Sequence, residues 1–140
     1  MASAATMDVR EFSKEQLLEL HRSLLRPRLI EEKMLKLLRQ GVLSKWFSGI
    51  GQEAIAVGMT ASLRDDDYIL PMHRNLGVFT GRNVDLVRLF CQLMGRGDGF
   101  SRGRERSFHF GTLEHNIVGM ISHLGAMLPV ADGLTLAQKL

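Results

Sequence analysis

Leucines recur at helical spacing through the first forty residues of the chain. Ser13 and Gln16, three residues apart, match a capping box, in which each side chain bonds the backbone of the other residue. Pro27 lacks a backbone N–H, so we expect a kink or a short break at this position. The pattern resumes after Pro27 and stops at Gly41, the first glycine of the chain. It therefore predicts a long helix that is interrupted near Pro27.

Glycines punctuate the rest of the chain. The segment 51–63 predicts a helix on which Ala54, Gly58 and Ala61 share one face. Small side chains on one face let another backbone approach closely, so we expect this helix to pack through them. Residues 68–71 then form a short candidate strand that ends at a proline.

Three further segments complete the pattern. Asn83 is a candidate N-cap for a helix that carries four apolar residues. Residues 95–111 hold five glycines and four arginines and show neither period, so they predict a long loop. Residues 116–122 are strand-like, and Pro129 lies near the start of a helix that runs toward Leu140. With two weak strands and no cap on the last helix, we expect one part of a larger α/β domain.

Composition allows an ordinary globular core and excludes several classes of protein. The 140 residues are 45% hydrophobic and 24% charged, outside the range of disordered chains. The net charge of +3 is a weak footprint for nucleic acid. The single cysteine, Cys91, cannot form an internal disulfide, which indicates a reducing compartment, so we expect a cytoplasmic protein. No apolar run approaches the ~20 residues of a membrane span, and the chain starts without an export signal.

The loop 95–111 offers one candidate chemistry. Its arginines and phenylalanines are Arg96, Arg102, Arg104 and Arg106 with Phe100, Phe108 and Phe110. Such an alternation resembles the platforms that bind single-stranded nucleic acid, whereas the alternative is a solvated loop whose aromatic rings dock on the core. The rest of the chain supplies no matching basic stripe. A nucleic-acid-binding module is therefore our second hypothesis, and a helical interaction domain is the third.

Two acidic segments are weaker candidates for metal sites. Three consecutive carboxylates, Asp65 to Asp67, point in different directions and are not followed by further oxygen ligands, which favours a solvated turn. Gly97-Asp98-Gly99 resembles the opening of the thiamin-diphosphate metal motif. The asparagine that completes that motif lies farther along than Asn116, so a turn is again favoured.

The order of several short blocks is more specific than any one of them. The blocks are Gly51-Gln52-Glu53-Ala54, Asp66-Asp67-Tyr68 with Pro71, His73 to Gly77, Arg102-Gly103-Arg104 with Ser107 and His109, and Ile121 to Leu124 with Pro129. In this order they resemble the α subunit, or the α half of a fused chain, of the thiamin-diphosphate-dependent first component of 2-oxo acid dehydrogenase complexes. The resemblance runs from about Phe12 to Leu140. It implies a thiamin-diphosphate-binding α/β fold, here a helix-rich N-terminal portion with an incomplete sheet.

The resemblance implies a cofactor site at four residues. His73 and Arg74 match the family's aromatic–arginine pair that reaches the diphosphate, with His73 in place of the usual tyrosine. A guanidinium suits that task because it bonds phosphate oxygens bidentately. Ser122 and Leu124 match positions whose backbone contacts the aminopyrimidine ring. Serine and leucine at these positions are more typical of the branched-chain enzymes than of the pyruvate enzymes.

The resemblance also implies a substrate pocket. His109 matches a family histidine on the loop that faces the substrate and is our candidate catalytic residue. Phe47 stands where the pyruvate enzymes carry a pocket histidine. Arg106 and Lys45 replace a methionine and an aromatic residue of the branched-chain enzymes. Two positive side chains in an apolar pocket leave the exact 2-oxo acid open.

Partners follow from the same resemblance. A β subunit, or β half, supplies the carboxylate that activates the aminopyrimidine, so we expect Glu53 to be a first-turn acid favoured by the helix dipole. The acyl group passes to a lipoyl-bearing acyltransferase. The Mg²⁺ ligands are expected beyond residue 140, so we expect the isolated chain to bind the cofactor weakly and to be inactive. Residues 1–12 are expected to be a flexible N-terminus, and 13–140 part of the cofactor-binding domain of a heterotetramer.

Overall fold

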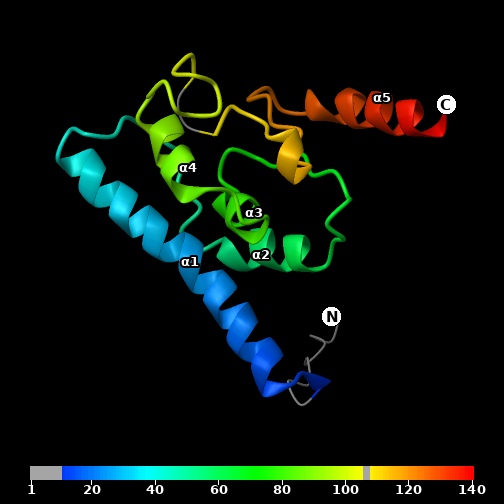
Figure 1. The fold of residues 1–140 in the computed structure, drawn as a ribbon, viewed down its shortest axis with the longest axis horizontal. Coiled ribbons are helices and arrows are strands. Elements are labelled where there is room, and N and C mark those ends of the chain that lie inside the picture. Colours follow the sequence, from blue (N-terminus) through cyan, green and yellow to red (C-terminus); the bar gives the residue numbers. More distant parts are fainter. Residues whose placement is uncertain (1–10, 106–107) are drawn as a thin grey trace, which may run out of the picture.

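Helices form most of the regular structure (Figure 1). The computed structural model describes residues 11–105 and 108–140, so most of the expected flexible segment 1–12 lies outside the described residues. In chain order the elements are α1 (Lys14–Arg39), α2 (Glu53–Ala61), α3 (Leu76–Gly81), α4 (Leu86–Leu93), the 3-10 helix η2 (Leu113–His115) and α5 (Met127–Lys139). The long α1 passes alongside α2 and α3, whereas α5 extends toward the C-terminus (Figure 1). Among the described residues, every helix is too short or too polar to span a lipid bilayer.

Both ends of α1 are fixed by local signals that the sequence carries. Ser13 and Gln16 form the expected capping box, with bonds of 3.2 Å and 2.8 Å between side chain and backbone. At the other end Gly41 has a φ of +70°, and Val42 donates its N–H to the carbonyl of Leu37 at 3.0 Å. This is the arrangement of a Schellman motif, which favours glycine because of its left-handed backbone. The predicted start and stop of α1 are confirmed.

Pro27 does not break the helix, so the expected short break was wrong. The 26 residues of α1 continue through Pro27, whose side chain is fully buried. It shares the buried face of α1 with Ile30 and Met34. Packing of this face against α2 and α3 offsets the hydrogen bond that proline cannot donate.

The helix α2 does not pack through the face that the sequence predicted. The stripe of Ala54, Gly58 and Ala61 is exposed, and α2 buries Ala56, Val57 and Thr60 instead. The close approach comes from glycines of α3, because a Cβ built on Gly81 would lie 2.7 Å from Cγ2 of Thr60. Small residues do permit the contact, but they are Gly77 and Gly81 of α3 with Ala56 of α2, and not the expected stripe of α2.

The N-cap of α4 is Asp85 and not Asn83, which corrects the prediction. The Asp85 carboxylate accepts the N–H of Arg88 at 2.7 Å. Asn83 has a left-handed backbone with a φ of +53°, and its side chain accepts a hydrogen bond from Arg26 at 3.0 Å. Asn83 therefore belongs to the turn between α3 and α4.

The expected incomplete sheet is not confirmed. In the described residues the two candidate strands are reduced to single bridges, Ile69 with Ile117 in parallel and Thr112 with Ile117 antiparallel. Two backbone bonds hold the parallel bridge, from Ile69 N–H to the Asn116 carbonyl at 2.8 Å and from Val118 N–H to the Ile69 carbonyl at 2.9 Å. The helix-rich character of the predicted fold is confirmed.

The described part of the loop 95–111 lies on the core through its aromatic rings. Phe108 and Phe110 are buried against Phe79 of α3, with ring centroids 5.5 Å and 4.9 Å apart, and Phe100 stacks on Phe110. The buried Gln92 accepts the N–H of Ser101 at 2.8 Å. The expectation that the aromatic rings of this loop dock on the core is confirmed for Phe108 and Phe110.

Candidate cofactor site

Arg74 lies on the turn that precedes α3, in the segment between α2 and α3. The turn that carries it is closed by Asn75, whose side chain accepts the N–H of Met72 at 2.8 Å. Nη1 of Arg74 donates to the carbonyl of Ser48 at 3.1 Å, and the guanidinium lies 5.5 Å from the ring centre of Phe47. The guanidinium is exposed, and this is its one hydrogen bond among the described residues. With five N–H donors, the group keeps capacity for an anion.

His73 contacts the ring of Phe47 and lies near Arg74 and His109. Its ring meets that of Phe47 edge to face, with centroids 4.2 Å apart. Burial lowers the pKa of His73, and the nearby charges of Arg74 and His109 lower it further. The neutral imidazole is therefore favoured at neutral pH, which leaves Arg74 as the cation of the pair.

His109 connects the aromatic loop to the segment before α5. Its Nε2 shares a hydrogen bond with Oγ of Ser122. The neighbours of His109 in sequence, Phe108 and Phe110, are buried in the core, so the backbone on both sides of the histidine is fixed. Ser122 itself is exposed.

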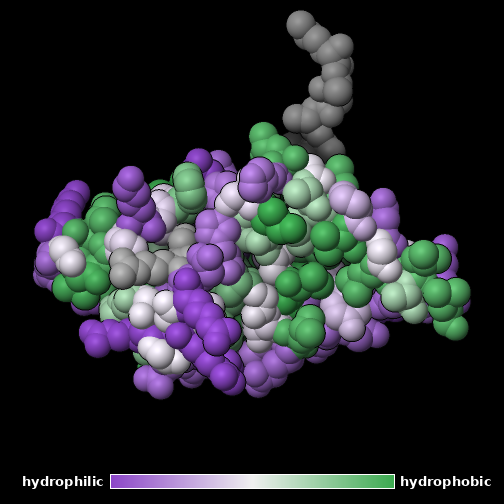
Figure 2. All heavy atoms as spheres, turned by 90° about the horizontal axis from the view of Figure 1, so that it is seen from above, coloured by the Kyte–Doolittle hydropathy of each residue, from purple (hydrophilic) through white to green (hydrophobic). Residues whose placement is uncertain are grey.

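A cavity of about 390 Å³ lies between the turn of His73 and the segment before α5. Its lining is mainly apolar and includes Met72, His73, Ser122, Leu124 and Met127. Leu124 is 94% exposed, so its side chain makes almost no contact with the rest of the chain. Figure 2 shows hydrophobic side chains gathered in the middle of one face and along the α5 end of the molecule. An apolar cavity with a few polar groups at its edge is typical of small-molecule sites.

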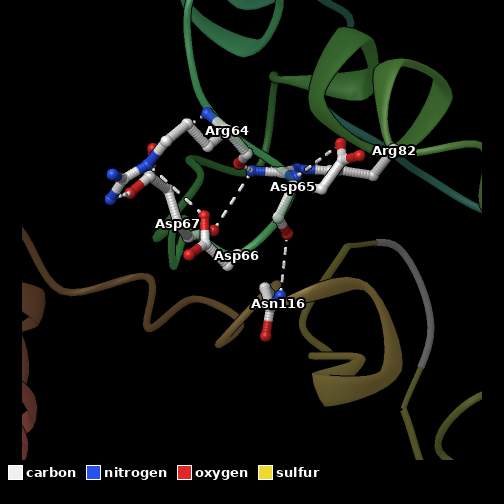
Figure 3. Close-up of polar contacts among 6 residues, drawn as sticks. All are labelled: Arg64, Asp65, Asp66, Asp67, Arg82 and Asn116. Atoms are coloured by element: carbon white, nitrogen blue, oxygen red, sulfur yellow. Dashed lines mark hydrogen bonds and ion pairs between the residues drawn. The ribbon is translucent and has the colours of Figure 1, made fainter.

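Arg82, the C-cap residue of α3, holds the acidic turn in place (Figure 3). The Arg82 side chain donates to the carbonyls of Arg64 at 2.7 Å and Asp67 at 3.1 Å. Asn116 donates its side-chain amide to the carbonyl of Asp65 at 2.8 Å. Hydrogen bonds from Arg64, first from its backbone N–H, hold the pKa of Asp67 below its usual value.

This arrangement supports the turn expected at 65–67. The Asp65 and Asp66 side chains are exposed, and the described residues contain no group of three or more His, Cys, Asp or Glu placed to hold a metal ion. The turn also has a structural task. Through Asn116 and the Ile69 bridge it aligns the two segments that flank the cavity.

The family to which the chain belongs is decided by a comparison with known protein families. Residues 21–140 match the family described as "Dehydrogenase E1 component", which is most of the chain. The chain belongs to the dehydrogenase E1 component family. The resemblance stated from the sequence blocks is thereby confirmed.

Individual relatives in this E1 family are α subunits. The chain is 45% identical over 89 residues to "Pyruvate dehydrogenase E1 component subunit alpha, mitochondrial" of Solanum tuberosum, covering 64% of this chain and 23% of that protein. It is 31% identical over 129 residues to "2-oxoisovalerate dehydrogenase subunit alpha, mitochondrial" of Dictyostelium discoideum, covering 92% and 29%. Its identity to "2-oxoisovalerate dehydrogenase subunit alpha" of Pseudomonas aeruginosa is 32% over 130 residues, covering 93% and 32%. The chain therefore spans less than a third of the length of these three relatives.

Six of the seven site residues predicted for this E1 chain are brought together. Contacts link Phe47 to His73 and Arg74, and His109 to Ser122, while the cavity joins His73, Ser122 and Leu124. The seventh, Arg106, lies outside the described residues, as does Ser107. The roles of all seven remain predictions.

The sequence reasoning missed Glu31, a buried residue of α1 behind Phe47. Its carboxylate accepts the backbone N–H of Gly49 at 2.8 Å, the indole N–H of Trp46 at 3.4 Å and the hydroxyl of Ser48. A signal was present, because Glu31 follows Pro27 by four residues and precedes Met34 by three, on the buried face of the helix. A charged residue inside an apolar stripe requires partners.

Glu53 is the first-turn acid of α2, as predicted. Its carboxylate accepts Nε of Arg28 at 2.6 Å and the N–H of Gly51 at 2.9 Å. The bond from Arg28 is the main cause that holds the pKa of Glu53 below its usual value. Glu53 lines a second pocket of about 280 Å³ together with His21 and Arg28. None of these three residues lines the cofactor cavity.

Proposed function

We propose that this chain carries the cofactor-contacting residues of the α subunit, or fused α half, of a 2-oxo acid dehydrogenase. The whole enzyme decarboxylates a 2-oxo acid on thiamin diphosphate and passes the acyl group to a lipoyl-bearing acyltransferase. One observation carries the proposal. The segments 70–73 and 120–125 line one apolar cavity. His73, on its lining, contacts the ring of Phe47, and the guanidinium of the next residue, Arg74, lies over the same ring.

The described residues fit the two chemically different ends of thiamin diphosphate. Arg74 offers an exposed guanidinium for the diphosphate, and the neutral His73 beside it adds a planar polar group without competing for the charge. The apolar cavity suits the rings of the cofactor, with Leu124 as an exposed apolar support and the backbone at Ser122 as the polar contact. Magnesium ligands are proposed to lie outside residues 1–140.

The chemistry comes from the cofactor, and the chain binds and shields it. When bound, thiamin diphosphate supplies an electron-accepting ring that stabilises the negative charge left when a 2-oxo acid loses CO₂. Phe47 and His109, with Arg106, are proposed to face the substrate. The hydrogen bond to Ser122 orients the His109 ring, so that the histidine can hold a proton at Nδ1 toward the reacting acid.

A branched 2-oxo acid is the proposed substrate, because serine and leucine occupy positions 122 and 124. Relatives named for 2-oxoisovalerate and for pyruvate both match the chain, so the test includes both acids. A β subunit or β half is proposed to supply the activating carboxylate, in an α₂β₂ heterotetramer. A cytoplasmic location stays a prediction.

The test uses the assembled enzyme, with this chain, the rest of α and the β partner. CO₂ release and acylation of a lipoyl domain are measured with 2-oxoisovalerate and with pyruvate, with and without thiamin diphosphate and Mg²⁺. We expect cofactor-dependent turnover with a higher kcat/KM for 2-oxoisovalerate, and none from the chain alone. Protease cleavage of the loop 95–119 should slow when cofactor, metal and partner are added. Turnover without the cofactor, or cleavage that is equally fast in both states, would contradict the proposal.

A further inference from the structure

Glu31 is a buried carboxylate that makes no contact with the cavity itself. Its residue is 3% exposed on the core-facing side of α1. Burying a carboxylate is costly unless hydrogen bonds or a cation compensate it. Within the part of the chain that the structure describes, no lysine or arginine forms an ion pair with Glu31, and hydrogen bonds alone hold it.

All of these hydrogen bonds come from one four-residue segment, 46–49. Oε1 accepts the N–H of Gly49 at 2.8 Å, while Oε2 accepts the indole of Trp46 at 3.4 Å and the hydroxyl of Ser48. Every donor faces an acceptor, and both oxygens are used. The segment is therefore fastened to α1 through a single side chain.

The other side of the same segment contacts the proposed diphosphate ligand. The Ser48 carbonyl accepts Nη1 of Arg74 at 3.1 Å, and the ring of Phe47 lies under the guanidinium. The backbones also touch, because a Cβ built on Gly49 would lie 2.2 Å from the carbonyl oxygen of Arg74 and 3.3 Å from Oε1 of Glu31. Gly49 thus lies between Glu31 and Arg74, with room for no side chain.

We propose that Glu31 is a positioning residue for Arg74. It fixes the segment 46–49, and this segment fixes the guanidinium that binds the cofactor diphosphate. The inference rests on the proposed function, since it assigns Arg74 to that diphosphate. An arginine already held in its binding geometry loses less conformational freedom when the anion arrives, so binding is tighter.

The change Glu31→Gln separates positioning from simple electrostatics. Glutamine has almost the same volume, but its amide NH₂ faces a donor of the segment in either orientation, so at least one hydrogen bond is lost. Removal of a negative charge near a diphosphate site would by itself strengthen binding of the anion. Loss of positioning weakens it. The sign of the change in affinity therefore decides between the two effects.

The experiment measures the dissociation constant of thiamin diphosphate by calorimetry, with Mg²⁺ present, in the assembled enzyme. We expect Glu31→Gln to raise this Kd roughly tenfold, which corresponds to about 1.4 kcal/mol. The kcat at saturating cofactor should change much less than the KM for the cofactor. The matched control is Glu32→Gln, the same charge change on the adjacent exposed residue, and it should leave the Kd unchanged.

A double substitution tests whether the effect passes through Arg74. Arg74→Ala alone should raise the Kd, and adding Glu31→Gln to it should raise the Kd little further. If Arg74→Ala leaves the Kd unchanged, the proposed cofactor role of Arg74 is wrong. Positioning by Glu31 is overturned by either of two results. In the first, Arg74→Ala raises the Kd but Glu31→Gln leaves it unchanged. In the second, Glu31→Gln raises the Kd as strongly in the Arg74→Ala background as in the wild type.

A milder variant keeps the inference testable if Glu31→Gln fails to assemble. Ser48→Ala removes one donor to Glu31 and keeps the backbone carbonyl that Arg74 uses. We expect a rise in the Kd of roughly threefold, smaller than that for Glu31→Gln. An unchanged Kd in Ser48→Ala, with the enzyme assembled, would count against the inference in the same way.

Discussion

The ring of His73 meets the ring of Phe47 edge to face, with centroids 4.2 Å apart and the ring planes at 61°. The contact joins the loop before α2 to the turn before α3, and the two residues are 26 positions apart in the sequence. It also shields the imidazole from water. Burial is the largest cause that lowers the pKa of His73, followed by the charges of Arg74 and His109.

Phe47→Ala should raise the pKa of His73 toward its ordinary value, because the imidazole becomes hydrated. The pKa of His73 is lower in the folded than in the unfolded chain, so the unfolded chain takes up the proton first. Stability is therefore lost as the pH falls below the ordinary value of 6.5, and the variant should lose less over that range. The titration of the His73 ring protons by NMR measures the shift. Phe12→Ala, near the start of α1, is the control and should leave this pKa unchanged.

Gly81→Ala should destabilise the chain, although alanine favours helices. A Cβ at Gly81 would lie 2.7 Å from Cγ2 of Thr60, which is closer than real side chains come. Overpacking of this kind costs roughly 1–3 kcal/mol. Denaturant unfolding measures the loss in the free energy of unfolding.

Two comparison variants make this prediction specific. Gly58→Ala, in α2 with nothing within 4 Å of the added Cβ, should stabilise the chain by roughly 0.5–1 kcal/mol. Thr60→Ser removes the clashing methyl group, so Gly81→Ala should cost much less in that background. If Gly81→Ala were as favourable as Gly58→Ala, the close approach of α2 and α3 would be disproved.

The two ends of α1 were predictable from the sequence, because the residues that form them are close together in the chain. The capping box at Ser13 and the left-handed Gly41 each depend on residues within a few positions of one another. Pro27 misled the prediction because its cost is local, whereas the burial that offsets it comes from other helices. Asn83 was mistaken for a cap because its partner, Arg26, lies 57 positions away.

The residues of the candidate site were predicted from the sequence, but the residues that hold them in position were not. The resemblance named the residues that meet at the cavity, because they stand in short recognisable blocks. Glu31 and Arg82 belong to no such block, since each acts on backbone groups 15 or more positions away. The position of Glu31 on the apolar face of α1 indicates that it needs partners, but the residue types do not indicate which distant groups those partners are.

Arg82→Met should destabilise the chain by about 2 kcal/mol, because two carbonyls lose a charged donor. The arginine side chain is 6% exposed and bonds the carbonyls of Arg64 and Asp67, whereas methionine keeps the volume but not the donors. Urea unfolding measures the loss. The control is Arg64→Met, whose charged group is exposed and should contribute little. Equal effects from both substitutions would show that the turn does not depend on the buried arginine.

Glu53→Gln should lower the free energy of unfolding by about 1 kcal/mol at pH 7, because the Glu53 carboxylate, 11% exposed, bonds both Arg28 and the Gly51 N–H. The hydrogen bond from Arg28 is the main cause that lowers the pKa of Glu53, so its contribution is complete above the ordinary carboxyl value of 4.5. It is lost as the pH falls from there through the folded-state pKa, since protonation then removes the charge in both states. Unfolding curves recorded from pH 7 downward should therefore show the wild type and Glu53→Gln converging in acid.

Glu32→Gln, on an exposed residue, should match the wild type at pH 7. A Glu53→Gln deficit that stays constant down to the most acidic sample would mean that the ionised carboxylate is not its source.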